Sequence, residues 1–541
     1  MSAHFKWYPA SEEVVVPWNA RYSFPSQANK AVKITPRIPP KNGAAFTPGN
    51  VIRVEFPAQG YVNPINTTIE FDVTLQGHGT ASNEVARFQN NIQSIFSRVR
   101  ILYGATPLED IINYNVIVRS LTEWTSTNQT MSIDQVGISE GIGGCVFGLD
   151  GNSTPKPGLF NARQNYIQGI DKTANTTAGV LIQSAGVGVI PNTVLGTGLT
   201  ATGANYCTRR YQINLACGLM TQDKLLPVKF MASQLAIEFT LEQAVACILS
   251  AGGSGAACTY GVTNFNLIPE ILEFDASYDA MFLKGLQDGG VPIKFSSWHT
   301  FIFGTSGSAT VNLLVQERSR SVKALFAVQR RNPPTVGTDS HATLFDSSST
   351  VGGSMQSYQW RIGGRYFPAQ PVQLTIGTGS GVGNGGCEAF VELQKALNVV
   401  GDYRLSCSVN PARWATPTAA AGATFDGVTN SSQNEFDYGA GTSLYSSAGA
   451  PTMTAVTIPG GTNGTSSACC SAVGSSCYVS AVDLETSNGI EISGLNAEEQ
   501  SDIAFIANWT NAQASGYNLE VYSYYDAMII LRENNVLELI Q

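Results

Sequence analysis

The stretch TIEFDVTLQ, residues 68–76, alternates apolar and polar side chains without interruption. Every second residue from Ile69 to Leu75 is apolar, and the residues between them are Glu, Asp and Thr. Because successive side chains of a β-strand point to opposite faces, this period of two predicts a strand with one buried and one polar face. The segments VIRVEF (51–56) and LAIEFTLE (235–242) repeat the pattern.

Strand-like segments continue along the chain, whereas helical periodicity is rare. Charged residues make up 13% of the sequence, about half of the roughly 25% usual in soluble domains. The 54 glycines fit many turns, and a surface poor in charge fits contacts with other subunits. An all-β protein built from sandwiches or barrels is therefore predicted. Further predicted strands are TFIFG (300–304), TVNLLVQ (310–316), SVKALFAV (321–328), GIEI (489–492) and NLEVYSYYDAMIIL (518–531).

Three segments have helical character. TPLEDIINYNVIVRSLTEW (106–124) begins with Thr106 as a candidate N-cap and has Glu109 three residues later. This spacing, with proline in the first turn, matches a capping box. SYDAMFLKGL (277–286) and EAFVELQKAL (388–397) are shorter, and the second gathers its apolar residues on one side. We expect three short helices among the strands.

Similar segments recur in the same order in two parts of the chain, which indicates two copies of one β unit. We expect a basic N-terminal arm at residues 1–45, a first unit at 46–290 and a second unit at 291–541. The paired segments are TTIEFDVTLQ (67–76) with SATVNLLVQ (308–316), SRVRILY (97–103) with RSVKALF (320–326), and LAIEFTLE (235–242) with YDAMIILRE (525–533).

The net charge of −9 is distributed unevenly. Residues 1–42 carry six basic and two acidic side chains, a net +4, which leaves −13 for the remainder. This asymmetry indicates that the arm and the body meet different surroundings. Two long segments rich in Gly, Ser, Thr and Ala, residues 141–206 and 415–478, also contain aromatic residues. They are predicted to be contact-forming loops.

Targeting and cysteine patterns narrow the class further. The beginning, MSAHFKWYPASEEVVV, lacks the basic segment and apolar core of a secretory signal, so secretion is not expected. No apolar run approaches the roughly 20 residues that span a bilayer. The ten cysteines show no paired CxxC motifs and no zinc-type spacing with histidine, and we expect reduced thiols.

The sequence lacks the residue patterns of a hydrolase or a metal site. No histidine lies beside a GxSxG, HExxH or HxE motif, and residues 148–153 lack the closing glutamate of a calcium loop. The acidic pairs Glu109–Asp110 and Glu498–Glu499 are interpreted as solvated helix starts, because neighbouring helical side chains diverge too far to act as an acid/base couple. The four histidines are His4, His78, His299 and His341.

A glycine-rich loop, residues 375–386, lies between the strand-like run 360–374 and the third predicted helix. Its spacing matches the GxGxxG pattern of dinucleotide sites. However, twelve residues are too many for a Rossmann turn. Asp402 lies at a plausible distance for the acidic residue of such a site, but the segment NVVGDYRL (398–405) is too short to form the second parallel strand that this residue would end. We interpret the loop as the edge of a sandwich. The three matching glycines are Gly381, Gly383 and Gly386.

Four segments, taken in order, resemble one protein family. They are FQNNIQSIFSRVRILYGATPLEDIINYNVIVRSL (88–121), GLMTQDKLLPVKFMASQLAIEFTLE (218–242), LIPEILEFDASYDAMF (267–282), and WRIGGRYFPAQPVQL (360–374) with EAFVELQKAL. This ordered set resembles double jelly-roll major capsid proteins of eukaryotic DNA viruses, of the polinton-like virus and virophage type.

The resemblance implies two tandem eight-stranded jelly-roll barrels with a few short helices and long loops. It implies a structural major capsid protein that forms homotrimeric, pseudo-hexameric capsomers in an icosahedral virion. Expected partners are copies of the chain and minor capsid and penton proteins, with genome or an internal membrane meeting the arm. No enzyme activity, small-molecule substrate, cofactor, catalytic residue or metal ligand is expected. The alternative is a β-sandwich module that binds carbohydrate or a receptor.

Overall fold

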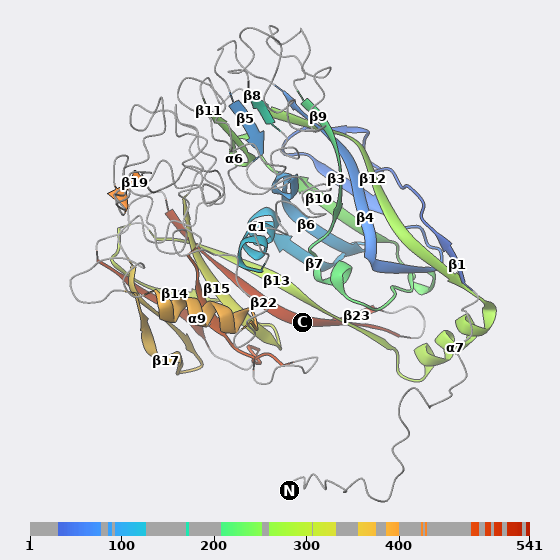
Figure 1. Cartoon of the computed structure of the whole chain (residues 1–541). Coiled ribbons are helices and arrows are strands. Elements are labelled where there is room, and N and C mark those ends of the chain that lie inside the picture. Colours follow the sequence, from blue (N-terminus) through green and yellow to red (C-terminus); the bar gives the residue numbers. More distant parts are fainter. Residues whose placement is uncertain are drawn as a thin grey trace, which may run out of the picture.

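Two β-sandwiches, joined by a helix, make up the described part of the chain in this computed structural model (Figure 1). The structure describes residues 31–76, 85–88, 92–125, 169–171, 207–251, 259–305, 307–331, 355–374, 386–399, 424–425, 428–429, 478–485, 493–498, 502–510, 517–532 and 537–541.

The first sandwich has two facing antiparallel sheets. One has the order β1 (Ala31–Ile34), β12 (Thr259–Phe274), β4 (Tyr61–Gln76), β9 (Cys207–Asn214), with β2 (Ala45–Phe46) also paired to β12. The other has the order β3 (Val51–Glu55), β10 (Leu235–Leu241), β6 (Phe96–Tyr103), β7 (Thr106–Ile112). A small third sheet contains β11 (Ile248–Ala251), β5 (Val85–Phe88) and β8 (Gly169–Asp171).

The second sandwich repeats this design. Its first sheet has the order β13 (Val291–Gly304), β22 (Tyr517–Leu531), β15 (Val322–Arg331), β20 (Ser480–Asp483), with β23 (Leu537–Ile540) also paired to β22. Its second sheet has the order β14 (Thr310–Val315), β21 (Ile503–Trp509), β16 (Met355–Ile362), β17 (Arg365–Gln373). A two-stranded ribbon joins β18 (Thr424–Phe425) and β19 (Val428–Thr429).

Both sandwiches share one strand order. When the eight principal strands of each are numbered along the chain, one sheet reads 1-8-3-6 and the other 2-7-4-5. Strands distant in sequence therefore lie side by side, as in the β12–β4 and β22–β15 pairs. This arrangement of two Greek keys is the jelly roll. The predicted fold class, two tandem jelly rolls with few short helices, is confirmed.

The internal repeat is present, but the segment pairs that pointed to it are not structurally equivalent. The first pair matches β4, the third strand of the first sandwich, with β14, the second strand of the second sandwich. The second pair matches β6, the fourth strand of the first sandwich, with β15, the third strand of the second. The last pair matches β10, the seventh strand of the first sandwich, with β22, the eighth strand of the second. The sequence similarity therefore reflects shared alternation rather than equivalent position.

The beginning of the described chain belongs to the first sandwich. In β1, Ala31 pairs with Phe274 and Ile34 with Ile271 of β12. Residues 31–34, assigned from sequence to the arm, thus extend the sheet as its first strand.

Aromatic rings from facing sheets fill the first core. Phe71 of β4 stacks on Phe265 of β12 and meets Phe96 of β6 edge-on, with a centroid distance of 5.6 Å in both contacts. Phe239 of β10 contacts Phe265 at 5.3 Å. All four rings are buried. The alternation of residues 69–73 therefore points Ile69, Phe71 and Val73 into this core.

The second core is built in the same way. Trp360 of β16 is fully buried against Phe505 of β21, with ring centroids 4.7 Å apart. The hydroxyl of Tyr358 donates a hydrogen bond of 3.2 Å to the carbonyl of Ala481, which lies in the facing sheet. Burial of large aromatic side chains is the main favourable term for such a core.

Helices are few and short in the part of the chain that the structure describes. Asp275 caps the helix between the sandwiches by accepting a 3.2 Å hydrogen bond from the backbone N–H of Tyr278. The helices predicted at 277–286 and 388–397 are confirmed as α7 and α9. Within the described residues, the helical elements are η2 (Ile92–Ile95), α1 (Tyr114–Thr125), α5 (Gly218–Thr221), η4 (Val228–Phe230), α6 (Ala244–Cys247), α7 (Ala276–Gln287) and α9 (Cys387–Ala396).

The helix predicted at 106–124 is wrong in its first half. Residues 106–112 form β7, which pairs antiparallel with β6, and α1 begins only at Tyr114. Asn113, between them, has a φ of 56°, a left-handed conformation that asparagine tolerates. Pairing with β6 and burial of Leu108 and Ile111 outweigh the local capping-box signal.

The strand-like run 360–374 is a hairpin rather than one strand. Gly363 and Gly364 have φ values of 54° and 85° and connect β16 to β17. Two positive φ angles are what a two-residue hairpin turn requires, and glycine adopts them without strain. β17 is the outer strand of its sheet, which suits the prolines Pro368 and Pro371 within it.

Candidate functional site at the junction of the two jelly rolls

The first jelly roll lies against an outer strand of the second. In the described sheet, β13 has a neighbouring strand on one side only, which is β22. β7 and α5 of the first jelly roll pack onto β13 (Figure 1). The hydroxyl of Thr300 in β13 donates a 2.8 Å hydrogen bond to the carbonyl of Ile112 in β7. Since an open strand edge offers unpaired N–H and C=O groups, this contact shields part of it.

Glu109 of β7 joins three elements at this junction. Its carboxylate accepts hydrogen bonds from the backbone N–H groups of Gly218 at 2.7 Å and Leu219 at 3.1 Å, and from the hydroxyl of Ser297 in β13 at 2.6 Å. Burial raises the pKa of Glu109, and these three donors oppose the rise. The carboxylate thus fixes β7, α5 and β13 relative to one another.

The sequence interpretation of Glu109 and Asp110 as a solvated helix start was wrong. Glu109 is 2% exposed. Asp110, the next residue along the strand, pairs with Arg98 of β6, whose Nε lies 2.6 Å from Oδ1. Because alternate side chains of a strand point to opposite faces, the two carboxylates have separate surroundings.

α5 approaches β13 so closely that only glycine fits at position 218. A Cβ atom on Gly218 would lie 1.9 Å from the carbonyl oxygen of Ser296 and 2.7 Å from its carbonyl carbon. Both atoms belong to the backbone of β13, so no side-chain rotation can relieve the overlap. Gly218 therefore sets how near the two jelly rolls lie.

A buried ion pair lies behind the junction. Arg330 Nε donates to Glu520 Oε2 at 2.6 Å, and Arg330 Nη2 lies 2.5 Å from Oε1. Burial alone would lower the pKa of Arg330, but the charge of Glu520 raises it overall. From the first jelly roll, the amide of Asn113 donates to Glu520 at 3.3 Å. Nearby, Trp124 of α1 stacks on Phe326 of β15 at 5.2 Å.

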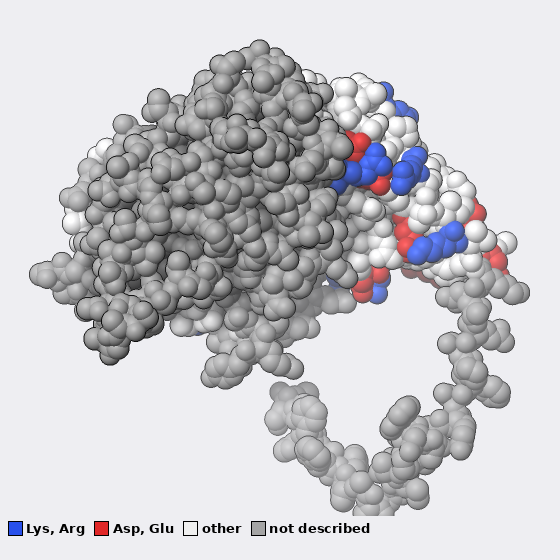
Figure 2. Space-filling model, turned by 45° about the horizontal axis from the view of Figure 1, so that its top comes forward, with Lys and Arg blue, Asp and Glu red and all other residues white. Residues whose placement is uncertain are grey.

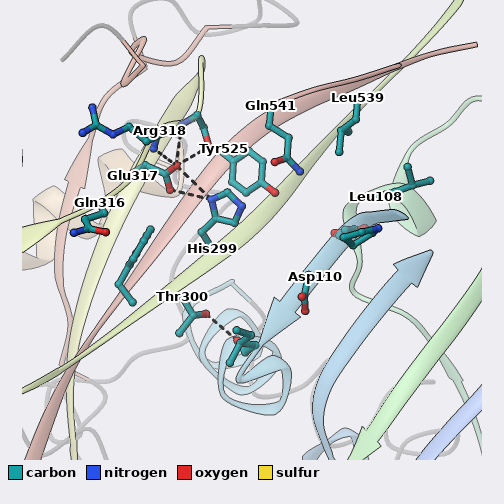
Figure 3. A pocket seen from close by; sticks show the side chains of 15 residues that line it. Leu108, Asp110, His299, Thr300, Gln316, Glu317, Arg318, Tyr525, Leu539 and Gln541 are labelled. Carbon is teal, nitrogen blue, oxygen red and sulfur yellow. Dashed lines mark hydrogen bonds and ion pairs between the residues drawn. The ribbon is translucent and has the colours of Figure 1, made fainter. Parts of the chain in front are cut away.

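A cavity of about 490 Å³ opens at the same junction (Figure 3). Its walls come from β7, β13, β22, β23 and the segment that follows β14. Nδ1 of His299 lies 3.2 Å from Oε2 of Glu317, and the imidazole stacks on Tyr525 with centroids 4.1 Å apart. Glu317 also accepts hydrogen bonds from the backbone N–H and the hydroxyl of Ser319, at 2.9 and 2.6 Å.

These contacts determine the charge of Glu317. Burial alone would raise the pKa of its carboxyl. The hydrogen bond and charge of His299, aided by the Ser319 hydroxyl, outweigh burial and lower that pKa to about 2. Glu317 therefore remains ionised inside the protein, and its acceptor oxygens hold the imidazole in one orientation.

Glu317→Gln should lower the free energy of unfolding by roughly 3 kcal/mol at about pH 7. The folded-state pKa of about 2 lies below the ordinary value of 4.5. The ionised carboxylate therefore contributes stability that is fully present above that ordinary value and is lost as pH falls towards the folded-state pKa. Urea unfolding at neutral and acidic pH should show the difference between wild type and variant narrowing across this window.

Glu498→Gln is the matched control for this experiment. Glu498 is exposed and pairs with Arg320 at 2.8 Å. An exposed pair contributes at most about 1 kcal/mol, so this variant should show a small and nearly pH-independent change. If the difference in free energy of unfolding between wild type and Glu317→Gln stayed constant down to low pH, the stabilising role assigned to the ionised Glu317 carboxylate would be contradicted.

Of the other residues singled out from sequence, His299 lines the cavity at this junction and Gly386 does not. His299 lies in β13. Gly386 precedes α9, without a side-chain cap. The other positions singled out from sequence lie outside the described residues; these are Gly381, Gly383, Asp402, His4, His78, His341, Glu499, residues 148–153 and GIEI at 489–492.

Among the residues whose placement is described, no group of three or more His, Cys, Asp and Glu side chains is arranged to hold a metal ion. None of the helices within those ranges has the length and apolar character needed to cross a bilayer.

No protein-family model and no curated protein matches the chain. Solved structures do. A chain of the Sputnik virophage structure has a TM-score of 0.50 at 9% identity, covering 98% of this chain and 92% of its own. The Faustovirus major capsid protein has a TM-score of 0.49 at 8% identity, covering 96% and 93%. The mavirus major capsid protein has a TM-score of 0.43 at 9% identity, covering 100% and 95%.

The Sputnik comparison extends over almost the full length of both chains, so it includes both sandwiches in tandem. Together with the repeated strand order, it establishes that this chain has the double jelly-roll fold. The class of protein resembled by the four sequence segments is thereby confirmed at the level of fold.

Proposed function

We propose that the protein is the structural major capsid protein of an icosahedral virion. The observation that carries the proposal is the presence of two jelly rolls with identical strand order in one chain. Three such chains around a threefold axis place six similar units in a ring, which is the pseudo-hexameric symmetry needed to tile a shell. The likeness to a chain of a virophage particle supports the same role.

The charge arrangement of the first jelly roll supports contacts between like copies. Lys and Arg side chains lie beside Asp and Glu side chains on the face seen in Figure 2. On the outside of this sandwich, Arg210 pairs with Asp72 at 2.7 Å and Lys33 pairs with Glu270. A face whose charges are already paired within the chain can meet another subunit without burying a lone charge.

The division of labour along the chain is part of this proposal. The two jelly-roll domains meet at residues 290 and 291, and the basic segment at the N-terminus meets minor capsid or penton proteins, genome or an internal membrane. The segments 141–206 and 415–478, which lie almost wholly outside the described residues, supply contacts in the trimer. The protein works in the virion as a structural component and not as an enzyme.

The alternative of a carbohydrate-binding module receives less support from the placement of tryptophan. Such a module needs exposed aromatic rings that converge on one loop end. Among the described residues, every tryptophan is buried and packs in a core; these are Trp124, Trp298, Trp360 and Trp509.

Deletion of residues 430–470 should leave a folded chain with a poor yield of trimer, because the deletion removes a proposed subunit contact while both cores remain. Native mass spectrometry of wild type and variant measures the trimer fraction, and negative-stain microscopy should show hexagonal outlines only for wild type. A wild-type protein that is monomeric under all assembly conditions would contradict the capsid role. An unchanged trimer fraction in the variant would refute the proposal that residues 430–470 supply a trimer contact.

A further inference from the structure

We propose that the cavity at the barrel junction binds the guanidinium group of an arginine side chain carried by a partner polypeptide. The proposal concerns the isolated chain and does not depend on the capsid role. Three features of the cavity carry it: an oriented imidazole, an excess of carboxylates, and an apolar wall with aromatic faces.

The imidazole of His299 is pre-organised to accept a hydrogen bond. Glu317 is fixed by Ser319 and by the backbone N–H of Arg318 at 2.9 Å, and its oxygens only accept. Nδ1 of His299 therefore carries the proton, and in the neutral ring Nε2 is a free acceptor. Figure 3 shows the ring held between Glu317 and Tyr525 at the cavity wall. A fixed acceptor loses little entropy when a donor binds.

The charged groups of the wall favour a cation. The carboxylates of Asp110 and Glu317 lie in the lining, with Arg318 as its basic residue. Glu109 also borders the cavity, but its carboxylate is already held by Gly218, Leu219 and Ser297. β7 carries Asp110 on the side of the cavity across from Glu317 (Figure 3). Asp110 is paired with Arg98, but a carboxylate has about four acceptor positions and can receive a second donor group. Opposite charge at short range is attractive even at partial exposure.

The apolar wall selects a side chain with a long stem and a flat head. Leu108, Ile112, Phe301 and Leu539 contribute to the lining, and Ile112 is 41% exposed. The methylene stem of arginine covers such surface while its head stays polar. A planar guanidinium also stacks on aromatic faces and presents five donors, whereas a lysine ammonium offers a point charge. The volume of about 490 Å³ falls within the range of ligand pockets.

The test uses full-length protein labelled with ¹³C in histidine only. The chain has four histidines, so the spectrum is simple, and His299→Gln assigns the relevant signal. The probes are acetyl-Ala-Arg-Ala-amide and the same peptide with citrulline, an uncharged isostere of arginine. The His299 signal should move on titration with the arginine peptide and stay in place with the citrulline peptide. Equal shifts with both peptides, or no shift with either, would overturn the proposal.

Three variants locate the binding. Asp110→Asn should weaken binding of the arginine peptide by about fivefold or more, because it removes one charge-assisted hydrogen bond. Gln316→Glu adds a carboxylate at an exposed lining position and should tighten binding. Asp72→Asn is the matched control, because Asp72 also holds an arginine on a sheet face, outside the cavity. If Asp110→Asn and Gln316→Glu bind like wild type, the assignment to this cavity is wrong.

A titration with spermidine distinguishes an arginine side chain of a polypeptide from a free polyamine as the cation that the cavity binds. If the partner is a polypeptide, the arginine peptide should shift the His299 signal at a lower concentration than spermidine does. The reverse order would show that the cavity accepts a free polyamine and would overturn the assignment to a polypeptide.

Discussion

Gly218→Val is expected to lower the free energy of unfolding by about 3–5 kcal/mol or to prevent folding. The first added atom would lie 1.9 Å from the carbonyl oxygen of Ser296, so α5 and β13 must separate. That separation also breaks the hydrogen bond from Gly218 to Glu109, which leaves a buried carboxylate with fewer donors. Urea unfolding and the yield of soluble protein measure the effect.

Gly285→Ala is the matched control. Gly285 lies inside α7, and a Cβ atom there would meet only the Cγ2 of Val291, at 4.0 Å. Alanine favours a helix interior over glycine by up to about 1 kcal/mol, so this variant should be neutral or slightly more stable. If Gly218→Val were as stable as Gly285→Ala, the jelly rolls would not be held at the distance described here.

Arg330→Met should lower the free energy of unfolding by about 3–5 kcal/mol, because it leaves Glu520 buried without its cation. Glu520 is 3% exposed, so water cannot replace the guanidinium without opening the junction. The amide of Asn113 in the first jelly roll, at 3.3 Å, and the hydroxyl of Tyr522 would remain as neutral donors to the carboxylate. Denaturant unfolding provides the measurement.

The double variant Arg330→Met with Glu520→Leu should recover most of that loss, since it removes both charges and keeps apolar volume. Arg210→Met is the control for loss of an arginine elsewhere. Arg210 pairs with Asp72 on an exposed face, where a pair contributes at most about 1 kcal/mol. A double variant no more stable than Arg330→Met would show that the single change acts through packing rather than through the unpaired charge.

Sequence periodicity predicted the strands well because burial on one face leaves a direct record in the residue order. The alternation at 68–76 and 235–242 corresponds to β4 and β10, whose apolar residues fill one core. The segment 106–112 failed because its local signal for a helix start is strong. Its true partner, β6, is recognised only when the sheet is assembled.

The junction could not be predicted from the same patterns. Glu109 and Ser297 are separated by 188 residues, and no spacing rule connects them. Neither Gly218 nor Glu317 belongs to a motif, since their roles arise from a close approach and from a contact with His299. The resemblance to capsid proteins predicted the tandem barrels but did not reveal how one barrel contacts the other.

The shielded border of β13 has a consequence for biosynthesis. Translation delivers β7 and α5 to the growing chain before any residue of β13 exists, so the cover is available when the fourteen-residue strand emerges from the ribosome. A gene fragment that starts at residue 291 would release that strand without its cover. Its open backbone groups would then recruit strands from other nascent molecules, so the order of the two halves along the gene itself guards against aggregation.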